Sequence, residues 1–180
     1  KRNMGDDAIL HVLLAQLRKL PVILTSLQAN KQQLKARLAE VPGLTFRDLP
    51  DPNGELATVL TVFLPSEEIA RHVAADLGTK VVAESGWHVY SNMEQILEQR
   101  TVTPEGCPFH CPIYEKRGGS VCYGKGMLPQ TDALLARAIN IGIGVDDPGL
   151  GTAFGVRMGD GPDEVERAAE QFIATARKYL

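Results

Sequence analysis

The 180-residue chain carries a formal net charge of −3, with 44% hydrophobic, 23% charged and 6% aromatic residues. This composition is typical of a globular protein and excludes a disordered or low-complexity chain. The slight negative charge gives no reason to expect nucleic acid or an anionic membrane as a partner, and no apolar run approaches the roughly 20 residues that span a bilayer. Three cysteines, with no secretory signal pattern in the sequence, predict a reducing, cytoplasmic setting.

Residues 6–41 have a helical period that is interrupted once. Pro21 fits the first residue of a second helix, where its missing N–H is harmless, and Pro42-Gly43 ends the segment. The apolar residues are spaced by three and four positions and predict an apolar stripe along the helix: Ile9, Val12, Leu13, Leu17, Leu20, Leu24, Leu27, Leu34 and Leu38. The opposite, solvated face is assigned Lys31, Lys35 and Arg37. This long kinked helix is either a core helix or a strut between two domains.

The next elements predict a sheet covered by helices. Residues 58–64 are β-branched and apolar, which indicates a buried strand, and residues 66–77 form a helix that begins at the N-cap Ser66 and ends at Gly78. Further strands are expected at residues 80–83, 139–145 and 153–158, and further helices at residues 131–137 and from Pro162 onward. This order predicts an α+β fold of two layers.

Residues 86–126 are irregular and rich in proline and glycine. Loops of this length in a globular domain are usually functional or disordered, and the aromatic residues here argue against disorder. If residues 87–92 formed a strand, His88 and Tyr90 would share one face and could hold a polyhydroxylated substrate by hydrogen bonds. The alternative is a structural His–Tyr pair at a strand edge.

The same region contains a cluster of metal-binding residue types. Cys107, His110, Cys111 and Cys122 could supply four soft ligands, but their spacing differs from that of a zinc knuckle. Loop cysteines packed as small hydrophobic residues are the preferred interpretation, and no metal is expected. Nothing in the sequence singles out one cysteine as a nucleophile.

Two segments near the beginning of the chain carry a family resemblance. Asn3-Met4-Gly5-Asp6, followed by residues 12–20 (VLLAQLRKL), resembles the DegT/DnrJ/StrS family of pyridoxal-phosphate-dependent sugar aminotransferases. In that family an N-Y-R-M-type loop leads into a helix ending A-Q-L-x-K-L. The later order, including Pro42-Gly43-Leu44 and the helix with Leu135-Ala136-Arg137, is similar, so the resemblance covers essentially the whole chain.

The resemblance implies the C-terminal small domain of a fold-type I aminotransferase, with a small, mostly antiparallel sheet. Residues 1–41 would be the connecting helix from a missing large cofactor domain, and residues 42–180 the small domain. The lysine that forms the Schiff base would lie upstream, so this chain would hold no catalytic residue and be inactive alone. Arg2 and Asn3 would lie near the phosphate of pyridoxal 5'-phosphate bound by the partner subunit of a homodimer.

The resemblance further implies a reaction and a substrate site. The whole enzyme would move an amino group from glutamate or glutamine to a keto sugar or a sugar-like acceptor. The acceptor pocket would be lined by His88, Tyr90, Ser91 and Asn92. Two alternatives stay open: a stand-alone dimerisation or binding module that uses the first helix, and a thiol- or zinc-dependent enzyme built on Cys107, His110, Cys111 and Cys122.

Overall fold

The computed structural model describes residues 4–86, 88–104, 106–120 and 123–180, and its centre is one antiparallel strand pair. Strands β2 (Val59–Phe63) and β3 (Ala138–Ile143) pair with Leu60 opposite Ile141 and Val62 opposite Ile139. These four side chains point to one face and are buried, because successive residues of a strand alternate between faces. On the other face, Thr61 Oγ1 donates to Asn140 Oδ1 at 2.9 Å.

Two short strands complete the sheet. β1 (Thr45–Phe46) runs antiparallel to β2, and β4 (Gly155–Val156) runs parallel to β3, so the order is β1-β2-β3-β4. Two of the three strand pairs are antiparallel. The predicted α+β fold with a small, mostly antiparallel sheet is therefore confirmed.

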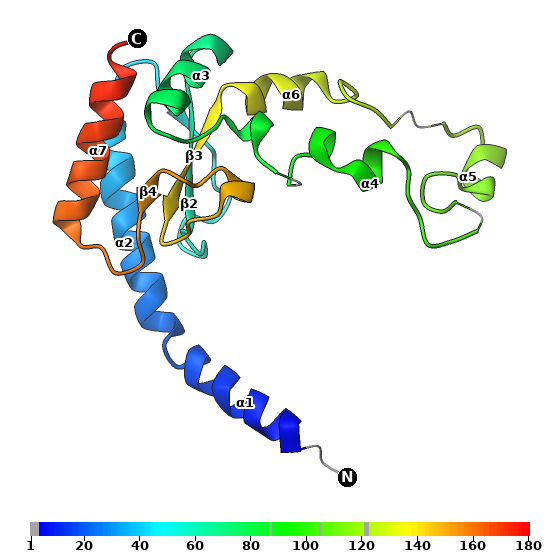
Figure 1. The fold of residues 1–180 in the computed structure, drawn as a ribbon, viewed down its shortest axis with the longest axis horizontal. Coiled ribbons are helices and arrows are strands. Elements are labelled where there is room, and N and C mark those ends of the chain that lie inside the picture. Colours follow the sequence, from blue (N-terminus) through cyan, green and yellow to red (C-terminus); the bar gives the residue numbers. More distant parts are fainter. Residues whose placement is uncertain (1–3, 87, 105, 121–122) are drawn as a thin grey trace.

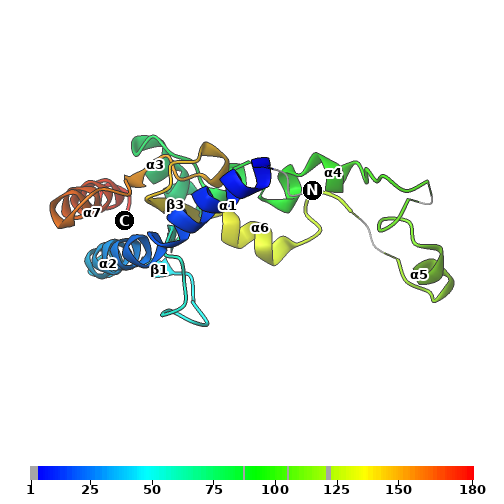
Figure 2. The same ribbon diagram turned by 90° about the horizontal axis from the view of Figure 1, so that it is seen from below.

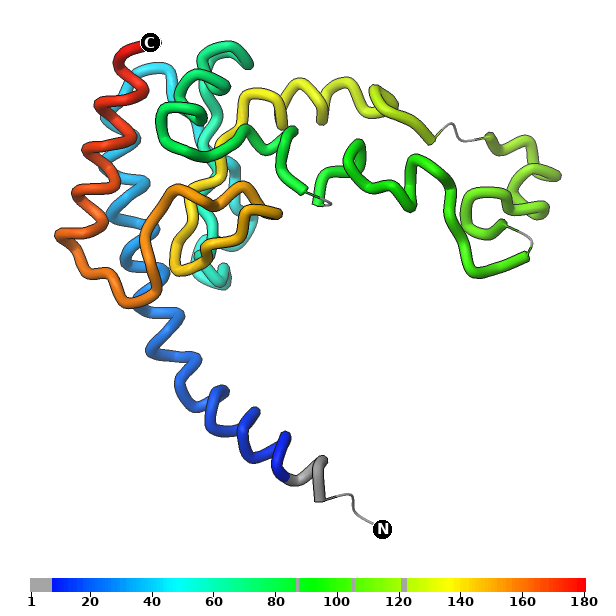
Figure 3. The backbone as a smooth tube through the Cα atoms, viewed as in Figure 1, coloured from blue at the N-terminus to red at the C-terminus, as the bar shows by residue number. Residues whose placement is uncertain are grey.

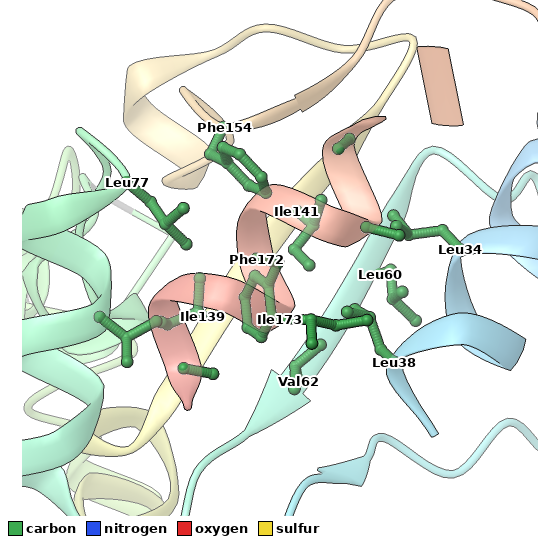
Figure 4. Packing of buried hydrophobic residues seen from close by; sticks show 14 of the residues in the cluster. Leu34, Leu38, Leu60, Val62, Leu77, Ile139, Ile141, Phe154, Phe172 and Ile173 are labelled. Atoms are coloured by element: carbon green, nitrogen blue, oxygen red, sulfur yellow. The ribbon is translucent and has the colours of Figure 1, made fainter. Parts of the chain in front are cut away.

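Three helices pack around the buried face of the sheet: α2 (Leu20–Leu38), α3 (Glu67–Asp76) and α7 (Pro162–Ala176). Helices α2 and α7 lie side by side (Figures 1 and 2). Phe172 of α7 has no exposed surface and lies among core side chains from both strands and from α2 (Figure 4). This single apolar cluster holds the two layers together.

The helix boundaries follow from local chemistry. Ser66 Oγ accepts from the backbone N–H of Ile69 at 3.2 Å and caps α3, whose chain turns away at Gly78 with φ of 68°. Before α7, a carboxylate oxygen of Glu164 accepts from the backbone N–H of Gly161 at 3.0 Å. That backbone donor lowers the pKa of Glu164 below its ordinary value. The predicted starts of both helices are confirmed.

Helix α1 (Met4–Leu17) projects away from the sheet (Figures 1 and 3). It meets α2 at a bend of 42°, and Pro21 lies in the first turn of α2, as predicted. Every residue from Ala8 to Val22 is exposed, so the apolar residues of α1 lie on a helix but are not buried by this chain. Among the described residues, no single helix is long and apolar enough to cross a membrane, although α1 and α2 meet that test as a bent pair.

A second projection begins after the first half of the chain. Residues 93–128, called the arm below, extend from the body and contain α4 (Glu94–Leu97) and α5 (Pro112–Lys116) (Figures 1 and 3). The chain returns through α6 (Pro129–Ala136), which leads directly into β3. The irregular character predicted for residues 86–126 is confirmed.

Three expectations are wrong in detail. Residues 80–83 do not form a strand: Val81 makes one isolated bridge to Ile139, and Val82–Glu84 then turn as a 3₁₀ helix. The described residues of 87–92 also lack a strand, because Tyr90–Asn92 form another 3₁₀ turn. Lys31 is not solvated; its side chain is buried and forms an ion pair with Glu55.

We expect Phe172→Ala to lower the free energy of unfolding by about 3–5 kcal/mol, because it removes a fully buried ring from the centre of the core. Urea denaturation followed by circular dichroism measures this change. The control Gln171→Ala lies on the exposed face of α7 and should change stability by less than about 0.5 kcal/mol. Equal effects of the two substitutions would contradict the assignment of Phe172 to the core.

Candidate functional site

The segment that contains the predicted acceptor residues lies between the body and the arm. Val89 is buried and anchors the segment, whereas Tyr90 and Ser91 are half-buried and His88 is exposed. Because Tyr90–Asn92 form a 3₁₀ turn, the alternation that would put His88 and Tyr90 on one face does not apply. His88, Tyr90, Ser91 and Asn92 therefore do not form one shared surface.

Tyr90 connects this segment to α6. Its hydroxyl donates to Asp132 Oδ2 at 2.8 Å and accepts from the backbone N–H of Leu128 at 3.2 Å. The contact bridges 42 residues of sequence and ties the two ends of the arm together. Tyr90 thus holds the shape of the site.

Asn92 has a similar positioning role on the other side of the segment. Its side-chain amide donates to the backbone oxygens of Ser85 at 2.6 Å and Ala83 at 3.0 Å. These bonds fold the 3₁₀ turn back on the turn formed by Val82–Glu84. Since its two amide protons are engaged, Asn92 supports the site rather than offering a free donor to a ligand.

A cavity of about 370 Å³ lies beside this segment, between α3, α6 and the returning end of the arm. Of the four predicted acceptor residues, only Ser91 lines it. The polar groups of its wall are Glu67, Arg71, Ser91, Lys125 and Asp132. A hydroxyl, a carboxylate and cationic groups on one small wall can serve as both donors and acceptors for a ligand rich in hydroxyl groups.

The charged side chains of the cavity differ in the number of ion pairs and hydrogen bonds that they already form within the chain. Arg71 Nε donates to Glu67 Oε1 at 2.9 Å, and the same guanidinium pairs with Glu84. Asp132 accepts from Tyr90 through one oxygen. Within the described part of the chain, Lys125 forms no ion pair, so its ammonium is the cation of this wall that is open to a ligand.

The predicted cofactor-binding residues, Arg2 and Asn3, lie outside the described residues. The helix that follows them, α1, projects away from the sheet (Figure 1). The role of Arg2 and Asn3 stays a prediction.

The arm holds the cysteine cluster. Cys107 and Cys111 both lie on it. Cys111 is a free thiol, and a cavity of about 500 Å³ beside it is lined by Phe109, His110 and Tyr114 among others. Among the described residues, no three His, Cys, Asp or Glu side chains come together as metal ligands, and Cys122 lies outside those residues. The backbone N–H groups of Tyr114 and then Ile113 lower the pKa of the Cys111 thiol.

Arg71, Lys125 and Asp132 also belong to the site, although the sequence does not single them out. Each lies on a different segment, and no local pattern connects them to Ser91; the acid in the first turn of α6 resembles an ordinary dipole-stabilising residue. No known protein-family model matches the chain. Any assignment of function therefore depends on the residues and geometry described above.

We predict that Tyr90→Phe speeds hydrogen exchange at the Leu128 amide, because it removes the acceptor of that N–H together with the bond to Asp132. Exchange measured by NMR at neutral pH reports the change. Tyr114→Phe, on the exposed helix α5, is the matched control and should leave the Leu128 amide unchanged. An unchanged exchange rate in Tyr90→Phe would show that this hydroxyl does not tie the arm to α6.

We also predict that the alkylation of Cys111 by iodoacetamide has its pH midpoint below that of the same thiol in the urea-unfolded chain. Because the folded state lowers its pKa, a larger fraction is thiolate at neutral pH. Mass spectrometry of digested samples follows each cysteine separately across pH. A midpoint equal to or above the unfolded value contradicts the backbone hydrogen bonds as the cause.

Proposed function

We propose that this chain is the small domain and connecting helix of a pyridoxal-phosphate-dependent aminotransferase that acts on a keto sugar or a sugar-like acceptor. The sequence resemblance supplies the reaction. The observation that carries the proposal is the uncovered apolar surface of α1, because such a helix needs protein packed against it.

The extent of that surface supports a covering domain. Ile9, Leu10 and Val12 are each about 60% exposed, and further apolar side chains follow at Leu13, Leu14 and Leu17. At 3.6 residues per turn these positions spread over more than half of the circumference of the helix. A surface helix buries a narrower stripe, whereas a helix that is apolar on most sides is enclosed. A large domain that surrounds α1 meets this requirement.

The cavity beside Ser91 supports a hydroxyl-rich acceptor. Ser91, Lys125 and Asp132 offer donors and acceptors along a wall of moderate size. In this proposal Ser91 contacts the acceptor, Tyr90 and Asn92 position the turn, and His88 approaches the acceptor from the exposed end of the segment. When bound, pyridoxal phosphate supplies the electron sink for amino-group transfer, and this domain supplies orientation.

The remaining parts of the proposal concern partners and location. Arg2 and Asn3 lie near the cofactor phosphate of the partner subunit in a homodimer, where a guanidinium suits a phosphate well. The amino donor is glutamate or glutamine, and the enzyme is cytoplasmic, consistent with the free thiol of Cys111. The apolar surface of α1 also suits a stand-alone module that pairs through this helix, which is the second candidate.

We expect this chain alone to form no stoichiometric Schiff base with pyridoxal phosphate, because the lysine that would form it lies in the large domain. Absorbance spectra measure the Schiff base. In the polypeptide that also contains the large domain, Ser91→Ala should raise the KM for the sugar acceptor roughly tenfold and leave the KM for the amino donor unchanged. Lys116→Ala, on α5 of the arm, is the control.

Two outcomes would contradict the proposal. A stoichiometric Schiff-base absorbance from this chain alone would place the lysine that holds the cofactor within it. A coding region without an upstream large domain, combined with a dimer that dissociates on Leu13→Glu, would establish the stand-alone module instead, because a charge on α1 disrupts an apolar helix interface.

A further inference from the structure

A groove on the other side of the body is independent of the site beside Ser91. It has a volume of about 410 Å³ and lies between α2, β2 and the loop of residues 47–58, which Figure 2 shows beside α2 and β1. A second hollow of about 530 Å³ adjoins it and shares Lys35, Arg47, Leu49 and Pro52 with it. The groove shares no lining residue with the cavity beside Ser91.

Contacts from α2 hold the outer wall of this groove. The side-chain amide of Gln28 donates to the backbone oxygens of Asn53 at 3.3 Å and Glu55 at 3.0 Å. One turn further along α2, the buried ammonium of Lys31 pairs with the carboxylate of Glu55. These contacts fix the loop against the helix, so the groove is formed before any ligand binds.

The backbone of the wall is strained at one point. Ala57 lines the groove with φ of 58°, a left-handed conformation that alanine rarely adopts, and its side chain is buried. Such strain persists only when the surrounding contacts over-determine the conformation, and it is found often at ligand-binding sites. The contacts of Gln28 and Lys31 with the same loop meet that condition.

The charges of the groove are unbalanced. Its wall contains three cationic side chains, Lys31, Lys35 and Arg47, and one carboxylate, Glu55, which Lys31 already engages. Within the described ranges, neither Lys35 nor Arg47 forms an ion pair. The two open cations line the groove and the adjoining hollow alike, and Asp48 adds one carboxylate to the wall of the hollow.

A ring contact orients the ammonium of Lys35, and a backbone hydrogen bond fixes the main chain at Arg47. Lys35 Nζ lies 5.5 Å from the centre of the Phe46 ring, and the backbone N–H of Arg47 donates to Thr61 O at 3.3 Å. The rest of the wall is largely apolar and includes Leu49, Pro52, Leu56, Val59 and Leu60. A guanidinium and an ammonium beside an apolar wall suit a ligand with an anionic head and an apolar body.

We propose that this groove binds an organic phosphate monoester, with Arg47 and Lys35 on the phosphate and the apolar wall against the attached ring or chain. The planar guanidinium of Arg47 donates two parallel hydrogen bonds to phosphate oxygens, and Lys35 adds a point charge. Glu55, held by Lys31, keeps the loop in place and does not contact the phosphate. The site is separate from the proposed acceptor pocket, and its test is independent of the aminotransferase assignment.

The experiment titrates the whole isotope-labelled chain with phenyl phosphate, inorganic phosphate and phenol, followed by NMR. Phenyl phosphate should shift amides of residues 47–61 and bind more tightly than either fragment, because only it fills both halves of the groove. Arg47→Gln and Lys35→Gln keep the side-chain stems and should each weaken binding roughly tenfold. Lys80→Gln, an exposed cation outside the groove, should leave the affinity unchanged.

Three results would overturn the proposal. Phenol binding as tightly as phenyl phosphate would assign the groove to apolar ligands. If Arg47→Gln and Lys35→Gln bound phenyl phosphate as tightly as the original chain, Arg47 and Lys35 would not contact the phosphate. Shifts confined to residues around Ser91 and Lys125 would place the phosphate in the other cavity.

Discussion

The pairing of β2 with β3 is the constraint on which the rest of this structure depends. Its register places Leu60, Val62, Ile139 and Ile141 on one face, where Phe172 and the apolar side of α2 cover them. Because side chains alternate along a strand, a slip of one residue would turn this face to solvent. The same register also closes the long excursion between the strands: Phe63 lies opposite Ala138, and Leu64 N–H donates to Arg137 O at 2.9 Å.

That closure determines where the candidate site lies. The chain leaves β2, builds α3, the arm and α6, and returns to the same end of the strand pair. Arg137 strengthens the junction, since its guanidinium donates to Leu64 O at 3.3 Å and lies 5.6 Å from the centre of the Phe63 ring. The cavity beside Ser91 therefore lies next to the end of the central strand pair, although most of its wall comes from turns and helix ends.

The sequence allowed prediction of the elements whose signals are local. Ser66 and Pro162 marked helix starts, and β-branched runs marked β2 and β3, because caps and side-chain period act over a few residues. The contacts that a side chain makes with distant segments could not be predicted in the same way. The bond of Tyr90 to Asp132 and the burial of Lys31 against Glu55 depend on how distant segments meet, and neither leaves a local pattern. The strand expected at residues 80–83 failed for a related reason: Val81 is buried and bridges Ile139, but the chain then turns, and Ser85 Oγ donates to Val82 O at 2.7 Å.

Because α1 is exposed, formation of the core and packing of other protein against α1 can be separate events. From Ala8 onward, the first buried side chain is that of Leu27, well inside α2, so the core can form without the apolar residues of α1 from Ala8 to Leu17. Folding of the body is then a unimolecular process whose rate does not depend on protein concentration. In the proposal that other protein packs on α1, covering this helix is a separate encounter, with a neighbouring domain or with a second molecule. On that proposal a mutation in α1 would change assembly while leaving the cooperativity of unfolding of the body unchanged.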